Sequence, residues 1–252
     1  MPDDPAARLP SHDRIEVADA ASLLAATDRQ LDALAEDPRP TLRWYRTGRP
    51  AIVLGRGQRG LTLTAPTGVD VVRRPSGGGA VWLSPDVLSL DIALPSTHPW
   101  VHSDDLGAVF SRLGEVWRDA LAALGVRGLL VHTGPSTTPR ATDERSRLLA
   151  AVCYATVGRG EVLVQGRKLL GLSQRHRRHG TLVQCGLLRT WTPAVLLAAL
   201  GADPDDPEVI GAAVGLAELL PAAPSDAAVL EAVETALARA GLAGHPRAEL
   251  RS

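Results

Sequence analysis

Apolar and polar positions follow two different periods along the first half of the chain. Residues 17–36 carry apolar side chains at helical spacing and end before Asp-Pro-Arg-Pro, so they predict a helix. Short β-rich runs separated by Gly, Pro and Thr then predict strands at residues 41–47, 50–55, 69–74, 79–83 and 87–94. Residues 103–124 begin with a Ser-Asp-Asp cap and stay amphipathic up to Gly125, which indicates a second long helix.

The second half of the chain returns to strands and then becomes helical. A strand is expected at residues 128–134, and the polar stretch 135–147 predicts a mobile surface loop. Residues 161–174 predict two strands turning at Gln165 and Gly166, and residues 180–188 a further strand. Ala- and Leu-rich helices are expected at residues 192–201, 207–220 and 225–242. The pattern predicts an α+β fold with a mixed, largely antiparallel sheet flanked by helices.

Composition narrows the classes of function. A chain of 252 residues with 45% hydrophobic content can bury a full core. Its formal net charge of -1 gives no overall field to attract nucleic acid or an anionic membrane. No apolar run approaches the roughly 18 residues of a membrane span, and the acidic, proline-bearing N-terminus does not read as a signal peptide. We therefore expect a cytoplasmic protein that binds neither nucleic acid nor membrane.

Neither cysteine suggests a metal site. The two cysteines, Cys153 and Cys185, lack the paired spacing of zinc ligands. In a reducing compartment both are expected to be thiols.

One lysine stands out among 27 basic residues, because Lys168 is the only lysine and the chain has no asparagine. Such a bias indicates that surface lysines have been exchanged for arginine, which costs little at most exposed positions. A site that needs a compact, titratable ammonium cannot make that exchange, since arginine is planar and essentially never deprotonated. Lys168 is therefore a candidate functional residue, with incomplete drift as the plain alternative.

Three glycine-bearing stretches could approach a phosphate or carboxylate. "GRGQRG", starting at Gly55, formally matches a dinucleotide fingerprint, but no amphipathic helix follows it, so we reject that interpretation. "RRPSGGGAVW" places Gly77–Gly79 between two strands beside Arg73 and Arg74, which predicts close approach of a ligand to the backbone. An ordinary glycine-rich hairpin is the alternative. In "GRKLLGLSQ", glycines flank Lys168 in the same way.

These segments resemble the lipoate-protein ligase A family, within the biotin and lipoate ligase fold. "RWYRTGRPAIVLGRGQ" looks like that family's Leu-Gly-Arg-x-Gln strand, and "RRPSGGGAVW" and "EVLVQGRKLLGLSQR" follow in the family's order, with the family's invariant lysine at Lys168. The resemblance covers roughly residues 20–200. It implies a catalytic domain over residues 15–200, a disordered tail at residues 1–14, and a helical cover or reduced accessory segment at residues 201–252.

The same resemblance implies a reaction. Lipoate or octanoate would be activated with ATP and Mg²⁺ as an acyl-adenylate and then transferred to a lysine of a lipoyl carrier domain or glycine-cleavage carrier protein. Lys168 would stabilise the growing charge as catalytic residue. The remaining candidates form an acyl- and adenylate-binding set without metal ligands: Arg73, Arg74, Ser76, Gly77, Gly78, Gly79, Ala80, Gly171 and Ser173.

Cys153 supports a second mechanism. In the octanoyltransferases of this fold, a cysteine at a similar place before the "E-x4-GRK" segment accepts the acyl group from acyl carrier protein as a thioester, with no cofactor. Cys153 in "CYATVGRGEVLVQGRK" resembles that residue, and a nearby ammonium would favour its thiolate. A buried structural cysteine is the bland alternative. The sequence also departs from the ligases at "WLSPDVLSLD" and "VQCG", which leaves open a silent carrier-binding or acyl-binding protein. The separate C-terminal accessory domain of the longer ligases has no counterpart in the resemblance, which leaves open an accessory subunit.

Overall fold

The computed structural model describes residues 14–102, 104–242 and 245–246, so the disordered tail expected at residues 1–14 lies, except for Arg14, outside the described residues. Within these residues the strands form a large sheet of eight and a small sheet of three. The large sheet runs in the order β1 (Ile15–Ala18), β2 (Thr41–Thr47), β6 (Val87–Pro95), β10 (Gly180–Leu188), β9 (Arg167–Arg177), β8 (Val162–Val164) and β7 (Leu129–Val131), and β11 (His245–Pro246) also pairs with β2. The small sheet has the order β4 (Asp70–Arg73), β3 (Ala51–Leu54) and β5 (Val81–Leu83).

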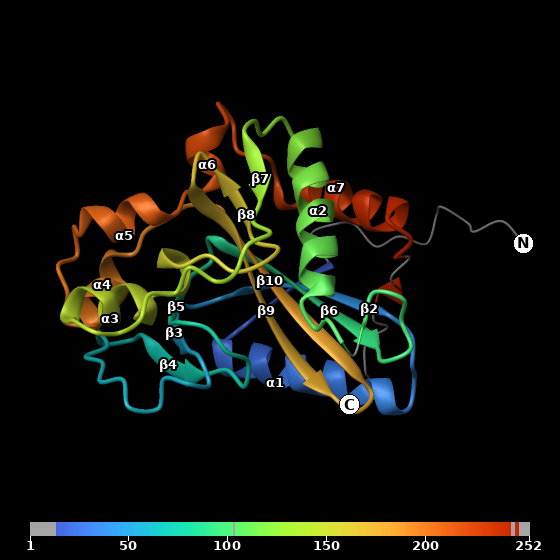
Figure 1. Ribbon diagram of the computed structural model, residues 1–252, viewed down its shortest axis with the longest axis horizontal. Helices are drawn as coiled ribbons and strands as arrows, with labels where there is room; N and C mark the ends of the chain where they lie inside the picture. Colours follow the sequence, from blue (N-terminus) through green and yellow to red (C-terminus); the bar gives the residue numbers. More distant parts are fainter. Residues whose placement is uncertain (1–13, 103, 243–244, 247–252) are drawn as a thin grey trace, which may run out of the picture.

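Pairing in the large sheet is mixed and mostly antiparallel. Neighbours from β2 through to β7 are antiparallel, whereas β1 and β11 pair with β2 in parallel. The helices are α1 (Ala20–Asp32), α2 (Ala108–Ala123), α3 (Glu144–Ala151), α4 (Ala194–Ala199), α5 (Pro207–Ala212), α6 (Leu216–Leu219) and α7 (Asp226–Arg239). Two 3₁₀ turns, η3 (Ala33–Ala35) and η4 (Cys153–Ala155), complete the elements used below. The predicted α+β fold, with a largely antiparallel sheet flanked by helices, is confirmed (Figure 1).

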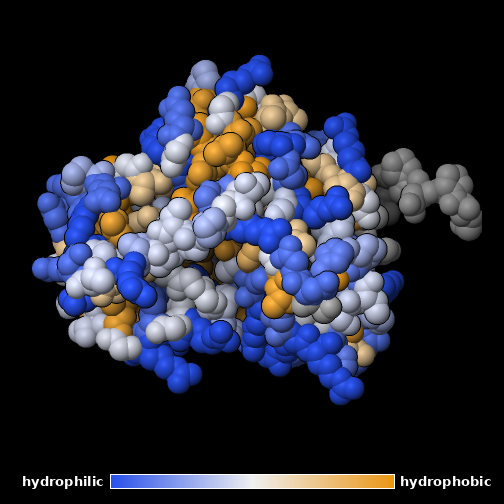
Figure 2. Space-filling view, in the orientation of Figure 1, coloured by the Kyte–Doolittle hydropathy of each residue, from blue (hydrophilic) through white to orange (hydrophobic). Residues whose placement is uncertain are grey.

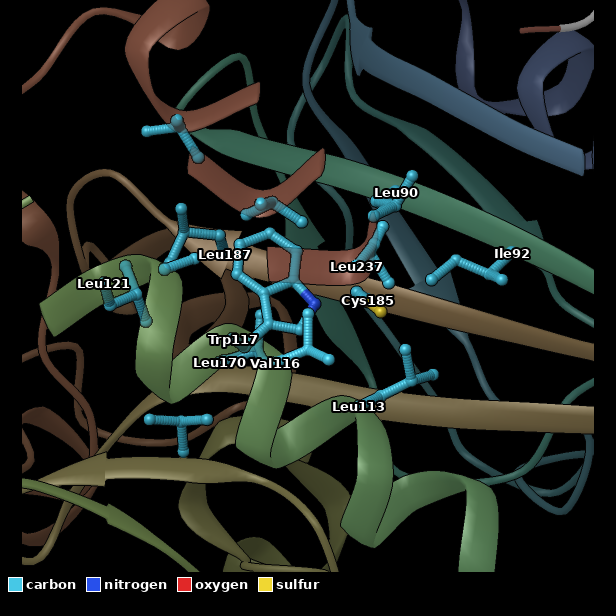
Figure 3. Packing of buried hydrophobic residues seen from close by; sticks show 14 of the residues in the cluster. Leu90, Ile92, Leu113, Val116, Trp117, Leu121, Leu170, Cys185, Leu187 and Leu237 are labelled. Carbon is cyan, nitrogen blue, oxygen red and sulfur yellow. The ribbon is translucent and has the colours of Figure 1, made fainter. Parts of the chain in front are cut away.

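One face of the large sheet carries the main apolar core. Alternate residues of a strand point to the same face, and on β6 these are Leu88, Leu90, Ile92 and Leu94, none of which is measurably exposed. They pack with residues of α2 and α7, and Figure 3 shows Trp117 of α2 at the centre of this packing. The C-terminal helix α7 is thus part of the same core as the sheet.

The other face of the large sheet is covered by α1 and the small sheet, and it contains buried charge. Asp91 on β6 has no exposed surface and accepts hydrogen bonds from Arg43 at 2.8 Å, Thr27 at 2.6 Å and Tyr45 at 3.0 Å. Thr27 belongs to α1, while Arg43 and Tyr45 belong to β2. This network therefore ties α1 to the centre of the sheet.

The small sheet lies between two apolar layers. Ala51 and Val53 on β3 pack with residues of α1, β6 and β10, whereas Ile52 and Leu54 pack with α4 and α5. The loop between β4 and β5 carries the triple glycine and is consequently held between the small sheet and the segment that leads to η4.

Two predicted helix starts are wrong. The helix expected from residue 17 begins at Ala20, because Asp19 accepts a hydrogen bond from the Ser22 amide as N-cap and residues 15–18 pair with β2. The helix expected from residue 103 begins at Ala108 and has no side-chain cap. Asp105, from the expected cap, instead pairs with Arg159 at 2.8 Å.

Two other segments differ from the prediction for local reasons. The loop expected at residues 135–147 ends early, because Asp143 and Ser146 form a capping box that starts α3. The helix expected at residues 207–220 is broken into α5 and α6. Between them the Val214 amide donates to the Lys168 carbonyl at 3.0 Å, so this backbone pairs with β9. The turn predicted at Gln165 and Gly166 is confirmed, with φ of 52° and 80°.

Candidate active site around Cys153 and Lys168

The triple glycine is shaped by contact with the chain's own backbone. A Cβ on Gly79 would lie 2.7 Å from the Cys153 nitrogen, and a Cβ on Gly55 would lie 1.9 Å from the Gly78 carbonyl oxygen. Ala80 also forms a β-bridge with Val152: the Cys153 amide donates to the Ala80 carbonyl at 2.9 Å, and the Ala80 amide donates to the Ala151 carbonyl at 2.6 Å. The close approach seen at these glycines is therefore made by the segment that carries Cys153, and the approach of a ligand stays a prediction.

Gln58 of the "LGRGQ" segment links the end of β3 to the end of α3, next to Cys153. Its side chain accepts a hydrogen bond from the Gly55 amide and donates to the Ala151 carbonyl, both at 2.9 Å. Because Ala151 ends α3, just before the turn that holds Cys153, three segments distant in sequence converge there.

The ammonium of Lys168 is the most completely satisfied charge at the site. Its Nζ lies 2.7 Å from a carboxylate oxygen of Glu161 and donates to the carbonyls of Cys153 at 2.9 Å and Thr156 at 3.0 Å. The side chain is only 1% exposed, and Nζ lies 5.0 Å from the ring centre of Tyr154. The three N–H donors of the ammonium thus each have an acceptor, and Lys168 holds the turn at both of its ends, Cys153 and Thr156.

Glu161 completes this arrangement, although the sequence did not mark it as a site residue. It is 4% exposed, and besides Lys168 it accepts hydrogen bonds from the Gly158 amide at 2.7 Å and the Leu172 amide at 3.0 Å. Such bonds offset the cost of burying a carboxylate. The only signal in the sequence was its spacing from the Gly-Arg-Lys segment.

Two pockets meet at Cys153. The first is mainly apolar, with walls from α1, β3, β5 and β6: Ala20, Leu23, Leu24, Val53, Val81, Leu83 and Val87. The second, of about 320 Å³, is more polar and is lined by Gly78, Gly79, Ser136, Thr138, Thr156, Gly158, Glu161 and Lys168, among others. Cys153 and Leu172 line both. The thiol, which is half-buried and free of any disulfide, therefore stands between an apolar chamber and a polar one.

A polar patch also lies in the apolar pocket. Gln184 on β10 accepts hydrogen bonds from Ser76 at 3.0 Å and Ser173 at 3.4 Å, and its amide group reaches the Tyr45 hydroxyl at 3.5 Å. Tyr45 in turn donates to Asp91. A continuous chain of hydrogen bonds thus runs from the glycine loop to the buried ion pair that anchors α1.

Arg73 and Arg74 have different environments. Arg73 is exposed, donates to the Gly55 carbonyl at 3.0 Å and lines neither pocket. Arg74 is 6% exposed, lines the apolar pocket, and donates to the carbonyls of Gly77 and Gly79 at 3.0 and 2.8 Å. Arg74 is therefore the arginine of this pair that faces the site.

The structure brings together most of the other predicted site residues. Gly78, Gly79, Gly171, Ser173, Lys168 and Cys153 line one or both pockets. Ser76 is buried behind the pocket wall, bonded to Gln184, and Ala80 is wholly buried against the Cys153 segment. Gly77 is exposed and lines neither pocket.

Three titratable groups of the apolar pocket are neutral at physiological pH, and burial moves their pKa values still further from it. Removal from water raises the pKa of the Tyr45 and Tyr154 hydroxyls, and it raises the pKa of the Cys185 thiol to about 12. Cys185 is thus a small apolar wall residue at neutral pH, unlike the half-buried Cys153.

A family model described as the lipoyl protein ligase A/B catalytic domain matches residues 19–238. Among curated proteins, the octanoyltransferase LipM of Carboxydothermus hydrogenoformans is 29% identical over 162 residues, or 60% of this chain and 56% of that protein. The octanoyltransferase LipM of Kyrpidia tusciae is 32% identical over 171 residues, or 64% of this chain and 58% of that protein. Both alignments thus span somewhat more than half of the relatives' own length.

Solved structures show the same fold. A lipoate-protein ligase A bound with ATP superposes with a TM-score of 0.64 at 15% identity, covering 94% of this chain and 89% of that one. A bi-partite lipoate protein ligase from Thermoplasma acidophilum, studied with its E2 lipoyl domain, gives a TM-score of 0.63 at 15% identity, covering 93% and 86%. None of the helices described for this chain combines the length and apolar content needed to cross a bilayer.

Proposed function

The chain belongs to the lipoyl protein ligase A/B catalytic-domain family, and from that premise we propose that it is an octanoyltransferase that carries the acyl group as a thioester on Cys153. The single observation that carries this proposal is the place of the thiol, at the junction of an apolar and a polar pocket. A thioester sulfur must hold an apolar chain on one side while its carbonyl meets a second reactant on the other.

The proposed reaction has two transfers. The thiolate of Cys153 attacks the thioester carbonyl of an octanoyl-acyl carrier protein, and the carrier thiol leaves with a proton. The neutral amine of a lysine on a lipoyl carrier domain or glycine-cleavage carrier then attacks the Cys153 thioester. An amide forms, the carbon–sulfur bond breaks, and Cys153 regains its thiol or thiolate state.

The residues of the chain have separate roles in this scheme. The apolar walls formed by Leu23, Leu83 and Val87, among others, would hold the octanoyl chain. The polar pocket would admit the arm of each carrier in turn. Lys168 would hold the Cys153 turn rigid through its bonds to the carbonyls of Cys153 and Thr156.

An ATP-dependent ligase, which the sequence placed first, would use the polar pocket differently. The backbone of Gly78 and Gly79 and the hydroxyls of Ser136 and Thr138 fit the demands of a nucleotide phosphate. Mg²⁺ would be coordinated mainly by those phosphates and by water, since no three His, Cys, Asp or Glu side chains cluster among the described residues. We favour the transferase because a ligase gives Cys153 no task, and because the matched curated relatives are octanoyltransferases.

The test is to incubate the purified protein with octanoyl-acyl carrier protein in the absence of ATP and to measure its intact mass. We expect one octanoyl group on the native chain and on Cys185→Ala, and none on Cys153→Ala. The modified native protein, once isolated, should pass its acyl group to a carrier-domain lysine.

A parallel reaction contains ATP, Mg²⁺ and octanoate or lipoate in place of the carrier donor. Pyrophosphate release and carrier acylation that survive Cys153→Ala would overturn the transferase and establish the ligase. A protein that accepts no acyl group from either donor would instead be a silent binding protein.

A further inference from the structure

Of the charged side chains around Cys153, some are paired with an opposite charge and one is not. The two pockets that Cys153 lines contain three residues that are charged at neutral pH among those described: Arg74, Glu161 and Lys168. The remaining titratable groups on these walls, Tyr45, Tyr154 and Cys185, are neutral at pH 7 because their ordinary pKa values lie above it, and burial raises each pKa further. The balance of charge at the sulfur therefore depends on two cations and one anion.

Lys168 and Glu161 cancel one another. Their charged groups lie 2.7 Å apart, both side chains are at most 5% exposed, and each is further tied to backbone groups. At the sulfur such a pair acts as a dipole, since the fields of its two ends oppose each other.

Arg74 has no such partner. Among the described residues no carboxylate forms an ion pair with it, and its donors serve the neutral carbonyls of Gly77 and Gly79. It is nevertheless 6% exposed, so water screens its charge poorly. A Cβ built on Gly78 would lie 2.9 Å from the Arg74 guanidinium and 3.8 Å from the Cys153 sulfur, which places both groups around the same point.

Charges on neighbouring elements do not alter this balance. On α3, which leads into the Cys153 turn, Arg145 is engaged by Asp206 and Glu208 of the α5 segment. Behind Tyr45, Asp91 is paired with Arg43. The Arg145 cluster keeps one uncompensated negative charge, but Arg145 and Glu208 are 40% and 57% exposed, so water screens their field at the thiol. The Arg43–Asp91 pair has no net charge.

We propose that Arg74 supplies the net positive charge that stabilises the Cys153 thiolate, while the neutral Lys168–Glu161 pair serves to position the turn. The inference deepens the proposed transferase, because it identifies what would activate that nucleophile. It differs from the arrangement expected from the sequence, in which the lysine ammonium favours the thiolate.

The test is the pH dependence of Cys153 alkylation by iodoacetamide, followed by mass spectrometry on the full chain. The assay needs neither acyl donor nor acceptor, so its outcome is separate from that of the transferase test. Removing the charge in Arg74→Met should raise the pH midpoint of alkylation by about one unit or more and slow the reaction at neutral pH about tenfold. Arg74→Lys should restore much of the native profile.

Two variants of the ion pair test the role given to Lys168 and Glu161. Glu161→Gln leaves Lys168 uncompensated, so the alkylation midpoint should fall. The double variant Glu161→Gln with Lys168→Met removes both charges, so its midpoint should stay near the native value although acyl transfer falls. If Arg74→Met does not fold, as judged by circular dichroism, these two variants decide the question.

A native alkylation profile in folded Arg74→Met would overturn the proposal. So would a double variant whose midpoint rises, since that would show that the Lys168 charge acts on the sulfur directly. A Glu161→Gln midpoint that does not fall would mean that Glu161 never compensated Lys168 at the thiol, and it would count against the proposal in the same way.

Discussion

On one face of the large sheet Leu88, Leu90 and Ile92 of β6 pack beneath α2 and α7, whereas on the other face Ser89 and Asp91 of the same strand meet α1 and the pocket. The first face contains apolar side chains that need only shape and volume to fit. The second contains buried ions and hydroxyls that must each find a partner. Because a strand alternates its side chains, one strand can serve the core and the site at once, so changes on the two faces should have separable effects.

The largest effect is expected from Asp91→Asn, which tests whether the polar face contributes only to function. Arg43 would keep its charge while 7% exposed, and breaking a buried ion pair costs about 3–5 kcal/mol in the free energy of unfolding. Urea unfolding measures the change. The matched control is Glu16→Gln, because Glu16 also pairs with Arg43 but is 42% exposed and should contribute about 1 kcal/mol or less. Equal costs for the two variants would contradict the proposed stabilising role of the network.

Leu90→Ala is the corresponding change on the apolar face. Leu90 is wholly buried, and the lost contacts and resulting cavity should cost about 3 kcal/mol. Acyl transfer per folded molecule should remain native, because Leu90 lines neither pocket. Leu130→Ala, at a side chain 59% exposed, should change stability by no more than about 0.5 kcal/mol. Loss of transfer activity in folded Leu90→Ala would show that the two faces are coupled.

Lys168→Arg should reduce acyl transfer more than stability, the reverse of what is expected for Leu90→Ala. A planar guanidinium cannot place its donors on Glu161 and on the two turn carbonyls at once, so acyl transfer should fall about a hundredfold, the order seen when one well-placed polar contact is lost from an active site. Steady-state rates with saturating donor measure the effect, and Arg167→Lys on the preceding, half-exposed residue is the control. Native transfer rates in Lys168→Arg would show that acyl transfer does not need the lysine ammonium.

The smallest effect concerns an ion pair outside both faces. Hydrogen bonds from Arg145 lower the pKa of Asp206 to about 2, below its ordinary value of 3.8. The carboxylate therefore stabilises the fold above about pH 4, and this contribution is lost as the pH falls from 4 towards 2. Since Arg145 is 40% exposed, Asp206→Asn should cost only about 1 kcal/mol at pH 7. Unfolding at several pH values checks that the difference disappears at low pH, and a constant difference would contradict the assigned cause.

The sequence predicted those parts of the fold that depend on local pattern. The pattern of β-rich runs located the strands of both sheets except β1 and β11, and the glycine in the Gln165–Gly166 turn located the hairpin between β8 and β9. The break between α5 and α6 could not be foreseen, because it results from pairing of Val214 with Lys168, almost fifty residues away. Likewise Asp105 resembled a helix cap until its partner, Arg159, was known.

The sequence indicated which residues belong to the candidate site better than it indicated what each of them contacts. Unusual composition singled out Lys168, and glycine clustering singled out residues 77–79. Neither signal could show that Gly79 faces the Cys153 backbone or that Glu161 neutralises the lysine, since both depend on long-range packing. Of two adjacent arginines, only the structure shows that Arg74 is buried and Arg73 is not.

The burial of Lys168 has a consequence for the surface of the protein. It is the only lysine in the sequence, and it is 1% exposed with its ammonium fully engaged. A protein that, under the proposed function, holds an activated acyl group for delivery to lysine side chains therefore offers no accessible lysine of its own to compete for it. Under that function the enzyme is protected against transferring the acyl group from Cys153 to a lysine side chain of its own, and the group remains available to the carrier.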